Sequence, residues 1–216
     1  MPRGMTRDQS PRSIISFLWD RANMVTLAGL LCGVSSIYFS SRQAFTAATV
    51  ALLWALLCDW FDGPIARRMR GRTDVDREFG AQLDSLSDLV CSGVAPGMLL
   101  LAVSGFDPWF LPGTFLLAVA GALRLAHFKT SDDDGAYTGL PIDSNIIVVT
   151  ALYPFRDLLG HAAFPWVLYA TVVALAIANV ASFRTPKPSI SWYYAVVAYV
   201  IGMTLFDMSD LLREFT

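Results

Sequence analysis

Apolar residues along the chain gather into seven segments, most of them close to twenty residues long and separated by short polar stretches. A run of about twenty apolar residues lets a helix cross the hydrocarbon core of a bilayer. We therefore predict an all-α, polytopic membrane bundle of about six to seven transmembrane helices. The fifth segment is short and polar at its start, so the number of transmembrane helices could be six or seven. The segments are 23–40, 43–69, 80–104, 109–129, 141–158, 164–183 and 190–212.

The first twenty residues are polar and rich in arginine, and they precede the first apolar segment. Their few large apolar residues predict a short helix lying on the membrane surface; these are Ile14, Ile15, Phe17 and Leu18. A cleaved signal peptide is the alternative, but no small-x-small cleavage site follows the first apolar run. We expect residues 1–20 to form a juxtamembrane segment and residues 21–216 a single membrane domain.

Composition supports a membrane protein. Hydrophobic residues make up 55% of the 216 residues, and the mean hydropathy is +0.50. Both values lie above those of ordinary soluble chains. The three cysteines, Cys32, Cys58 and Cys91, lie in apolar runs without paired spacing, so we interpret them as buried small side chains rather than a disulfide framework. No nucleic-acid partner is expected.

Four aspartates interrupt the second and third apolar segments: Asp59, Asp62, Asp84 and Asp88. A carboxylate at bilayer depth is costly and points to a functional site. Spacings of three and four residues place each pair on one helix face. Clustered carboxylates repel one another unless a cation lies between them, and carboxylate oxygens suit Mg²⁺ or Mn²⁺. One alternative is a structural role, in which the aspartates cap helices or pair with arginines. Another is a carboxylate-lined cation transporter, which would spread its acidic residues along several spans.

The arginines and lysines predict which end of the bundle faces the cytoplasm. With the N-terminus inside and seven spans, thirteen of them lie inside and three outside, the latter being Arg42, Arg156 and Arg213. Positive residues concentrate on the cytoplasmic side of membrane proteins. The four aspartates then lie at the cytoplasmic ends of the second and third spans, within reach of a water-soluble substrate. We expect a multi-pass protein of the cell membrane with its active site facing the cytoplasm.

The aspartates belong to a longer pattern that resembles the signature of the CDP-alcohol phosphatidyltransferase family. It is Asp59-x-x-Asp62-Gly63-x-x-Ala66-Arg67, then Gly80-x-x-x-Asp84-x-x-x-Asp88. Twelve residues separate Arg67 from Gly80, where the family usually has eight, and either an extra helical turn or a longer loop would absorb the difference. The resemblance implies an enzyme that uses CDP-diacylglycerol and works as a homodimer among membrane lipids.

The resemblance also implies a role for each residue of the pattern. The four aspartates, Asp59, Asp62, Asp84 and Asp88, would hold Mg²⁺ or Mn²⁺, and Asp88 would also take the proton from the acceptor hydroxyl. A further group would bind the CDP and phosphate moieties: Gly63, Ala66, Arg67, Gly80, Asn23 and Thr26. Asn23 is equally well explained as a residue that caps the first helix. No Ser-His or Cys-His pairing suggests a covalent intermediate, so we expect direct transfer.

The acceptor alcohol is less tightly specified by the sequence. The sequence from Asp84 to Pro96 and the run Gly139-Leu-Pro141 resemble the corresponding sequences of the phosphatidylserine synthase branch. This resemblance predicts L-serine as the acceptor. Arg124 would bind the serine carboxylate, with His127 or Lys129 assisting. Other acceptors stay open: glycerol phosphate would need a denser basic pocket, choline an aromatic cage, and an inositol compound is a third possibility.

Overall fold

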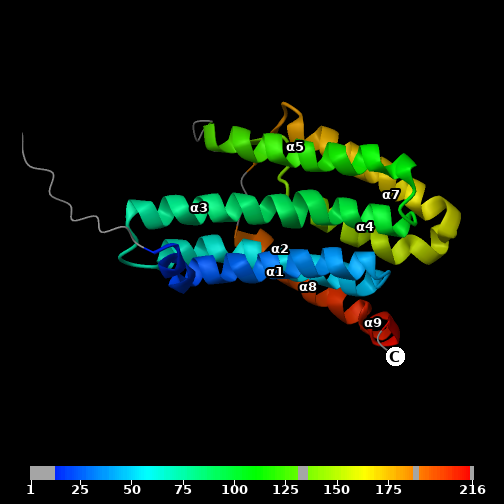
Figure 1. Cartoon of the computed structure of the whole chain (residues 1–216), viewed down its shortest axis with the longest axis horizontal. Helices are drawn as coiled ribbons and strands as arrows, with labels where there is room; N and C mark the ends of the chain where they lie inside the picture. Colours follow the sequence, from blue (N-terminus) through cyan, green and yellow to red (C-terminus); the bar gives the residue numbers. More distant parts are fainter. Residues whose placement is uncertain (1–12, 131–135, 187–189, 215–216) are drawn as a thin grey trace, which may run out of the picture.

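The computed structural model describes residues 13–130, 136–186 and 190–214. Long helices run side by side through most of this part of the chain (Figure 1). They are α1 (Arg21–Ser41), α2 (Phe45–Arg68), α3 (Asp74–Asp88), α4 (Ala95–Val103), α5 (Leu111–Thr130), α6 (Ser144–Leu152), α7 (Arg156–Val180), α8 (Ile190–Phe206) and α9 (Met208–Glu214). Short elements join them: η1 (Ile14–Trp19), η2 (Leu89–Val94), η3 (Pro108–Phe110), η4 (Tyr153–Phe155), β1 (Ala136–Thr138) and β2 (Arg184–Pro186).

The predicted fold class is confirmed. Five helical stretches are long and apolar enough to cross a membrane, and a shorter apolar helix covers Ser191–Phe206. The five are Arg21–Ser41, Phe45–Arg68, Asp74–Val103, Pro108–His127 and Ser144–Val180. The described part of the chain is therefore an all-α bundle of a multi-pass membrane protein, and each of the seven predicted apolar segments corresponds to helix.

The stretch Ser144–Val180 is a hairpin of two helices. Gly160 has φ 75° and ψ 160°, so the helical path breaks there. The flanking strands β1 and β2 pair antiparallel, and Leu140 N donates to Ala178 O at 2.9 Å, so the two ends of the stretch lie together. A left-handed φ is readily adopted by glycine. This reversal explains why the fifth and sixth segments were separate in the sequence pattern although one helical stretch contains both.

Leucine and other aliphatic side chains fill the centre of the bundle. Leu52 and Leu56 of α2, Leu99 of α4 and Leu117 of α5 are fully buried, and Val172 of α7 closes the same cluster. Many other large apolar side chains stay exposed on the outer faces of these helices. An exposed apolar surface of this extent is unusual for a soluble monomer and is expected where lipid surrounds the protein.

Helix α3 continues without a break into η2 and α4, so residues 74–103 form one long helical rod (Figure 1). It begins with a capping box: Thr73 accepts from Asp76 N at 3.2 Å, and Asp76 accepts from Thr73 N at 2.8 Å. The η2 segment is π-helical and starts directly after Asp88. Insertions of this kind occur often at functional sites.

The long linker after α2 is folded against the start of α1. Its Arg72 forms an ion pair of 2.8 Å with Asp20, and both side chains are nearly buried. Asp20 also caps α1 by accepting from Ala22 N at 2.9 Å. The residues by which the linker between Arg67 and Gly80 exceeds the usual family length therefore form a short loop and the first turns of α3. The N-termini of α1 and α3 and the C-terminal ends of α2 and α5 lie at one end of the bundle, at the left in Figure 1.

The short helix predicted around Ile14 to Leu18 is present as η1, and its position on the membrane surface stays a prediction. Ile14, Ile15 and Trp19 are exposed, whereas Phe17 stacks on Phe79 of α3 with ring centroids 4.2 Å apart. Exposed apolar side chains on a docked helix fit contact with a membrane surface.

Candidate active site

A cavity of about 600 Å³ opens between α2, α3, α5, the start of α6 and the start of α8. Its walls combine acidic, basic and aromatic side chains from segments far apart in the sequence. The chemically distinctive lining residues are Asp59, Trp60, Asp62, Gly63, Arg67, Asp84, Ser85, Asp88, Arg124, Asp143, Ser144, Thr185, Trp192 and Tyr193. A concave site with a few convergent polar groups is the usual form of a small-molecule site.

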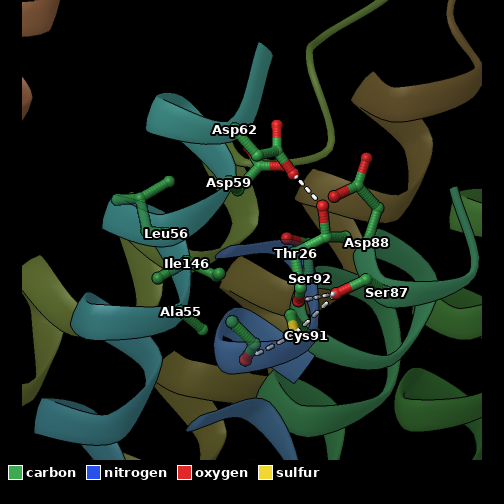
Figure 2. A pocket seen from close by; sticks show the side chains of 11 residues that line it. Thr26, Ala55, Leu56, Asp59, Asp62, Ser87, Asp88, Cys91, Ser92 and Ile146 are labelled. Carbon is green, nitrogen blue, oxygen red and sulfur yellow. Dashed lines mark hydrogen bonds between the residues drawn. The ribbon is translucent and has the colours of Figure 1, made fainter. Parts of the chain in front are cut away.

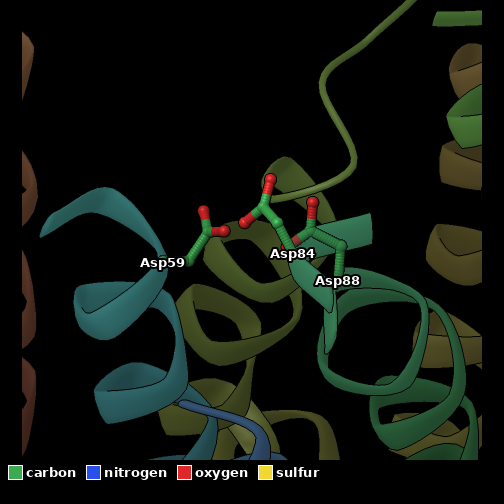
Figure 3. A group of neighbouring side chains, drawn as sticks. All are labelled: Asp59, Asp84 and Asp88. Atoms are coloured by element: carbon green, nitrogen blue, oxygen red, sulfur yellow. The ribbon is translucent and has the colours of Figure 1, made fainter. Parts of the chain in front are cut away.

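Three carboxylates converge in this cavity. Asp59 of α2 faces Asp84 and Asp88 of α3, and one oxygen of each lies within 4.8 Å of the others (Figure 3). Asp84 and Asp88 share a helix face because they are four residues apart. All three side chains are half-buried. The sequence therefore predicted correctly that aspartates from the two segments meet.

The fourth aspartate, Asp62, is buried beside this group. It accepts a hydrogen bond of 2.5 Å from the Thr26 hydroxyl of α1 (Figure 2). Its carboxylate also interacts with Asp84. Asp62 lies outside the set whose oxygens converge, so its role as a metal ligand stays a prediction.

The cavity floor is closed by close packing between α1 and α3. A void of about 10 Å³ lies below the carboxylates, between polar side chains such as Ser87 and Ser92 and apolar ones such as Leu56 and Ile146 (Figure 2). The Ser87 hydroxyl donates to Thr26 O at 3.4 Å. Asp59, Asp62 and Asp88 line the same void, so the acidic group borders apolar side chains of the bundle centre.

Two of the residues predicted to bind phosphate line the cavity. Gly63 and Arg67 follow Asp62 on α2, and Arg67 is exposed, with its charge within reach of a ligand. A side chain at Gly63 would meet Arg67 Nη1 at 3.5 Å, an ordinary contact distance. Ala66 is half-buried on α2 and does not line the cavity.

Asn23 and Gly80 lie outside the cavity lining. Asn23 is buried, and its amide donates to Phe17 O at 3.0 Å. A Cβ at Gly80 would lie 2.7 Å from Arg72 Nη2 and 3.1 Å from Asn23 Oδ1. Glycine at position 80 therefore allows α3, the linker and α1 to pack closely, and the predicted binding roles of both residues stay predictions.

Of the three residues predicted to bind the acceptor, Arg124 lines the cavity from α5. His127 is exposed and is not among the lining residues. Lys129 belongs to the last turn of α5, and its side chain lies outside the described part.

The structure adds Asp143, which the sequence interpretation missed. Asp143 immediately precedes α6 and lines the cavity, where its carboxylate interacts with Asp59 and Trp60 of α2. Its removal from bulk water raises the pKa of the Asp143 carboxyl, and the guanidinium of Arg124 opposes this shift. The signal in the sequence was the polar start of the fifth apolar segment, two residues after the Gly139-Leu-Pro141 run.

Aromatic side chains form another wall of the cavity. Trp60 of α2 and Tyr193 of α8 meet edge to face with centroids 5.1 Å apart, and Trp192 lies beside them. Aromatic residues at this end of α8 are also typical of a membrane interface.

The donor set fits a hard divalent cation. Three carboxylates with oxygens within 4.8 Å of one another offer the ligand type that Mg²⁺ and Mn²⁺ prefer. Such ions often keep coordination positions for substrate phosphate, and the cavity leaves space above the group. Within the described residues, Asp59, Asp84 and Asp88 are the group that meets this geometry.

The family profile of the CDP-alcohol phosphatidyltransferases matches residues 19–183, which include every helix that lines the acidic group. The chain belongs to the CDP-alcohol phosphatidyltransferase family. The resemblance drawn from the aspartate pattern is thereby confirmed for the family as a whole.

Similar proteins include several with related names. A CDP-diacylglycerol–serine O-phosphatidyltransferase of Helicobacter pylori is 31% identical over 132 residues, covering 59% of this chain and 54% of that protein. An archaetidylserine synthase of Methanothermobacter thermautotrophicus is 33% identical over 134 residues, covering 61% and 56%. A CDP-diacylglycerol–serine O-phosphatidyltransferase of Mycobacterium leprae is 27% identical over 205 residues, covering 88% and 67%. The chain spans about half the length of the first two proteins.

Proposed function

We propose that this protein transfers a phosphatidyl group from CDP-diacylglycerol to the hydroxyl of L-serine, forming phosphatidylserine and CMP. The observation that carries the proposal is the convergence of Asp59, Asp84 and Asp88 in one cavity of a family member. The names of the similar Helicobacter and Mycobacterium proteins support serine as the acceptor.

Asp59, Asp84 and Asp88 would hold Mg²⁺ or Mn²⁺, with Asp62 close enough to assist. A bound divalent cation would neutralise pyrophosphate charge and stabilise the departing CMP. Arg67 offers a planar set of donors to phosphate oxygens at the mouth of the cavity. Gly63 leaves space for the nucleotide to approach the backbone of α2.

Asp88 is the proposed general base. Its carboxylate accepts the proton of the serine hydroxyl, whose oxygen then forms a bond to the phosphorus that carries diacylglycerol. The bond between that phosphorus and the CMP oxygen breaks, and CMP leaves with the electron pair. A positioned carboxylate that removes this proton contributes about two to four orders of magnitude to the rate.

Arg124 is the proposed partner of the serine carboxylate. It lines the cavity from α5, whereas the phosphate-binding Arg67 lines it from α2. A guanidinium binds a carboxylate through two parallel hydrogen bonds, which fixes the acceptor's orientation as well as its charge.

Choline is the second candidate acceptor, because Trp60, Trp192 and Tyr193 line the cavity. Aromatic faces attract quaternary ammonium groups. Glycerol phosphate fits less well, because Asp143 also lines the cavity and its negative charge would repel the phosphate. Transport of a cation is disfavoured because the acidic side chains gather at one place rather than along a path.

We further propose that the cavity opens to the cytoplasm of the cell membrane. Arg67, in the last turn of α2, and Arg124 of α5 line the cavity, in keeping with positive residues facing the cytoplasm. The resemblance to the family also favours a homodimer, which the molecular mass of the detergent-purified protein would test.

An acceptor screen tests the proposal. Protein purified in detergent is mixed with CDP-diacylglycerol and Mn²⁺, and CMP release is measured with serine, choline, glycerol 3-phosphate or inositol. Serine should give the fastest release. Faster release with choline would favour the second candidate, and release independent of any acceptor would argue against transfer to an alcohol.

A further inference from the structure

The cavity contains a second charged pair, which lies next to the three converging carboxylates. Arg124 of α5 and Asp143 at the start of α6 both line the cavity, and their charges interact directly. Asp143 does not belong to the group whose oxygens lie within 4.8 Å of one another. One wall therefore presents a positive and a negative group side by side.

The position of Asp143 is fixed by the turn that precedes α6. Ile142 is buried, and Asn145 is completely buried with its amide donating to Ser92 O at 2.9 Å. Asn179 of α7 donates to Asn145 Oδ1 at 3.2 Å. These contacts tie the turn to η2 and α7 and so fix the backbone position of Asp143. Its carboxylate also interacts with Asp59, Trp60 and Arg124 of the cavity wall.

The charge pair is complementary to an amino alcohol that also carries a carboxylate. Arg124 matches the carboxylate, which leaves Asp143 to face the ammonium group. In serine only two carbon atoms separate the nitrogen from the hydroxyl oxygen, so the nitrogen must lie near the base. Asp143 interacts electrostatically with Asp88, the proposed base, and thus lies close to that position.

We propose that Asp143 binds the cationic nitrogen of the acceptor and selects for amino alcohols. Arg124 is the positive partner of the half-buried Asp143 carboxylate, and when Arg124 binds the acceptor carboxylate the ammonium group supplies a positive charge to Asp143. Trp60 and Tyr193 of the aromatic wall add attraction for the same cation. This inference rests on the proposed transferase function, but it concerns the nitrogen and holds for serine, ethanolamine or choline.

The test compares serine with 3-hydroxypropionate, which keeps the hydroxyl and the carboxylate and lacks the amine. The KM for serine and the inhibition constant of 3-hydroxypropionate against serine are measured for the wild type and Asp143→Asn. Loss of one charge-assisted contact should raise the serine KM about 10- to 100-fold. The inhibition constant of 3-hydroxypropionate should stay equal or fall, because a repulsive negative charge has been removed.

Two further variants act as controls. Asp143→Glu keeps the charge and should recover part of the serine affinity. Asp157→Asn makes the same chemical change at an exposed position in the first turn of α7, away from the cavity, and should leave both constants unchanged.

Several outcomes would overturn the inference. A parallel rise of both constants would mean that Asp143 only maintains the shape of the site. A large loss of Mn²⁺ affinity in Asp143→Asn, measured by electron paramagnetic resonance, would make Asp143 a metal ligand. If Asp143→Asn does not fold, wild-type turnover of glycerol as fast as serine would refute selection for nitrogen.

The proposed function can fail separately. If no acceptor in the panel releases CMP, the transferase proposal is wrong and this inference falls with it. If ethanolamine or choline is used in place of serine, the assignment of serine is wrong, and the role of Asp143 is supported.

Discussion

The hydroxyl of Thr26 donates a hydrogen bond of 2.5 Å to the carboxylate of Asp62, joining α1 to α2 beneath the acidic group. Both side chains are buried. A buried carboxylate needs such a partner because its desolvation is costly. Thr26 therefore orients Asp62, and this contact explains why a residue on α1 accompanies the aspartate pattern on the next two helices.

Replacing Thr26 by valine keeps the shape and removes the donor. Hydrogen bonds to charged groups contribute about 1.5–3 kcal/mol, so Thr26→Val should lower kcat/KM by about one to two orders of magnitude or reduce stability by a similar free energy. Steady-state kinetics and thermal unfolding in detergent separate the two. Thr26→Ser, which restores the hydroxyl, should recover most of the loss. Wild-type behaviour of Thr26→Val in both assays would show that the contact has no role.

Gly80 and Gly63 should respond differently to alanine. At Gly80 the new methyl group would displace Arg72 from its ion pair with Asp20 and crowd Asn23, so Gly80→Ala should destabilise the fold by about 1–3 kcal/mol. At Gly63 the nearest atom is 3.5 Å away, so Gly63→Ala should fold normally and raise the KM for CDP-diacylglycerol about tenfold, or about 1.4 kcal/mol.

Thermal unfolding and KM measurements on both glycine variants check this contrast. Gly202→Ala is the matched control, because a methyl group there meets no atom within 4 Å. An unchanged unfolding temperature for Gly80→Ala would contradict the packing role of Gly80.

The role of Asp88 can be separated from metal binding. Asp88→Asn keeps the size but loses basicity, so turnover should fall by about two to four orders of magnitude. Because Asp88 shares the cavity with Asp59 and Asp84, Mn²⁺ affinity must be measured in the same variant. A loss of turnover without a matching loss of Mn²⁺ affinity supports the base. If both fall together, Asp88 serves mainly as a ligand.

Arg124→Ala tests carboxylate recognition. Losing a charge-assisted contact of about 1.5–3 kcal/mol should raise the serine KM by one to two orders of magnitude and leave the KM for CDP-diacylglycerol nearly unchanged. Lysine keeps the charge without the planar arrangement of donors, so the serine KM of Arg124→Lys should lie between those of the wild type and Arg124→Ala. A rise confined to the KM for CDP-diacylglycerol would move Arg124 to the phosphate site.

Much of the architecture followed from the sequence because membrane helices are set by local composition. All seven predicted apolar segments are helical. The pattern already separated the fifth and sixth segments, but it did not show that the chain reverses at Gly160. A single residue with positive φ leaves no trace in the hydrophobic pattern, although it decides where α6 and α7 lie.

Part of the acidic group was predictable, since helical spacing brings Asp84 and Asp88 to one face, whereas Asp59 joins them from α2 through helix packing. Asp143 was not, because it precedes α6 by one residue and reaches the cavity only through the hairpin of α6 and α7. Trp192 also lines the cavity, although it belongs to a segment far from the aspartates in the sequence. Contacts between distant segments depend on helix packing, which residue spacing does not encode.

The most direct test follows both products in one reaction. Purified protein in detergent receives CDP-diacylglycerol and L-serine, and mass spectrometry quantifies phosphatidylserine and CMP with and without excess chelator. We predict equal amounts of the two products with Mg²⁺ or Mn²⁺ and neither product in chelator. Full activity in chelator would contradict a metal held by Asp59, Asp84 and Asp88, and CMP without phosphatidylserine would contradict transfer to serine.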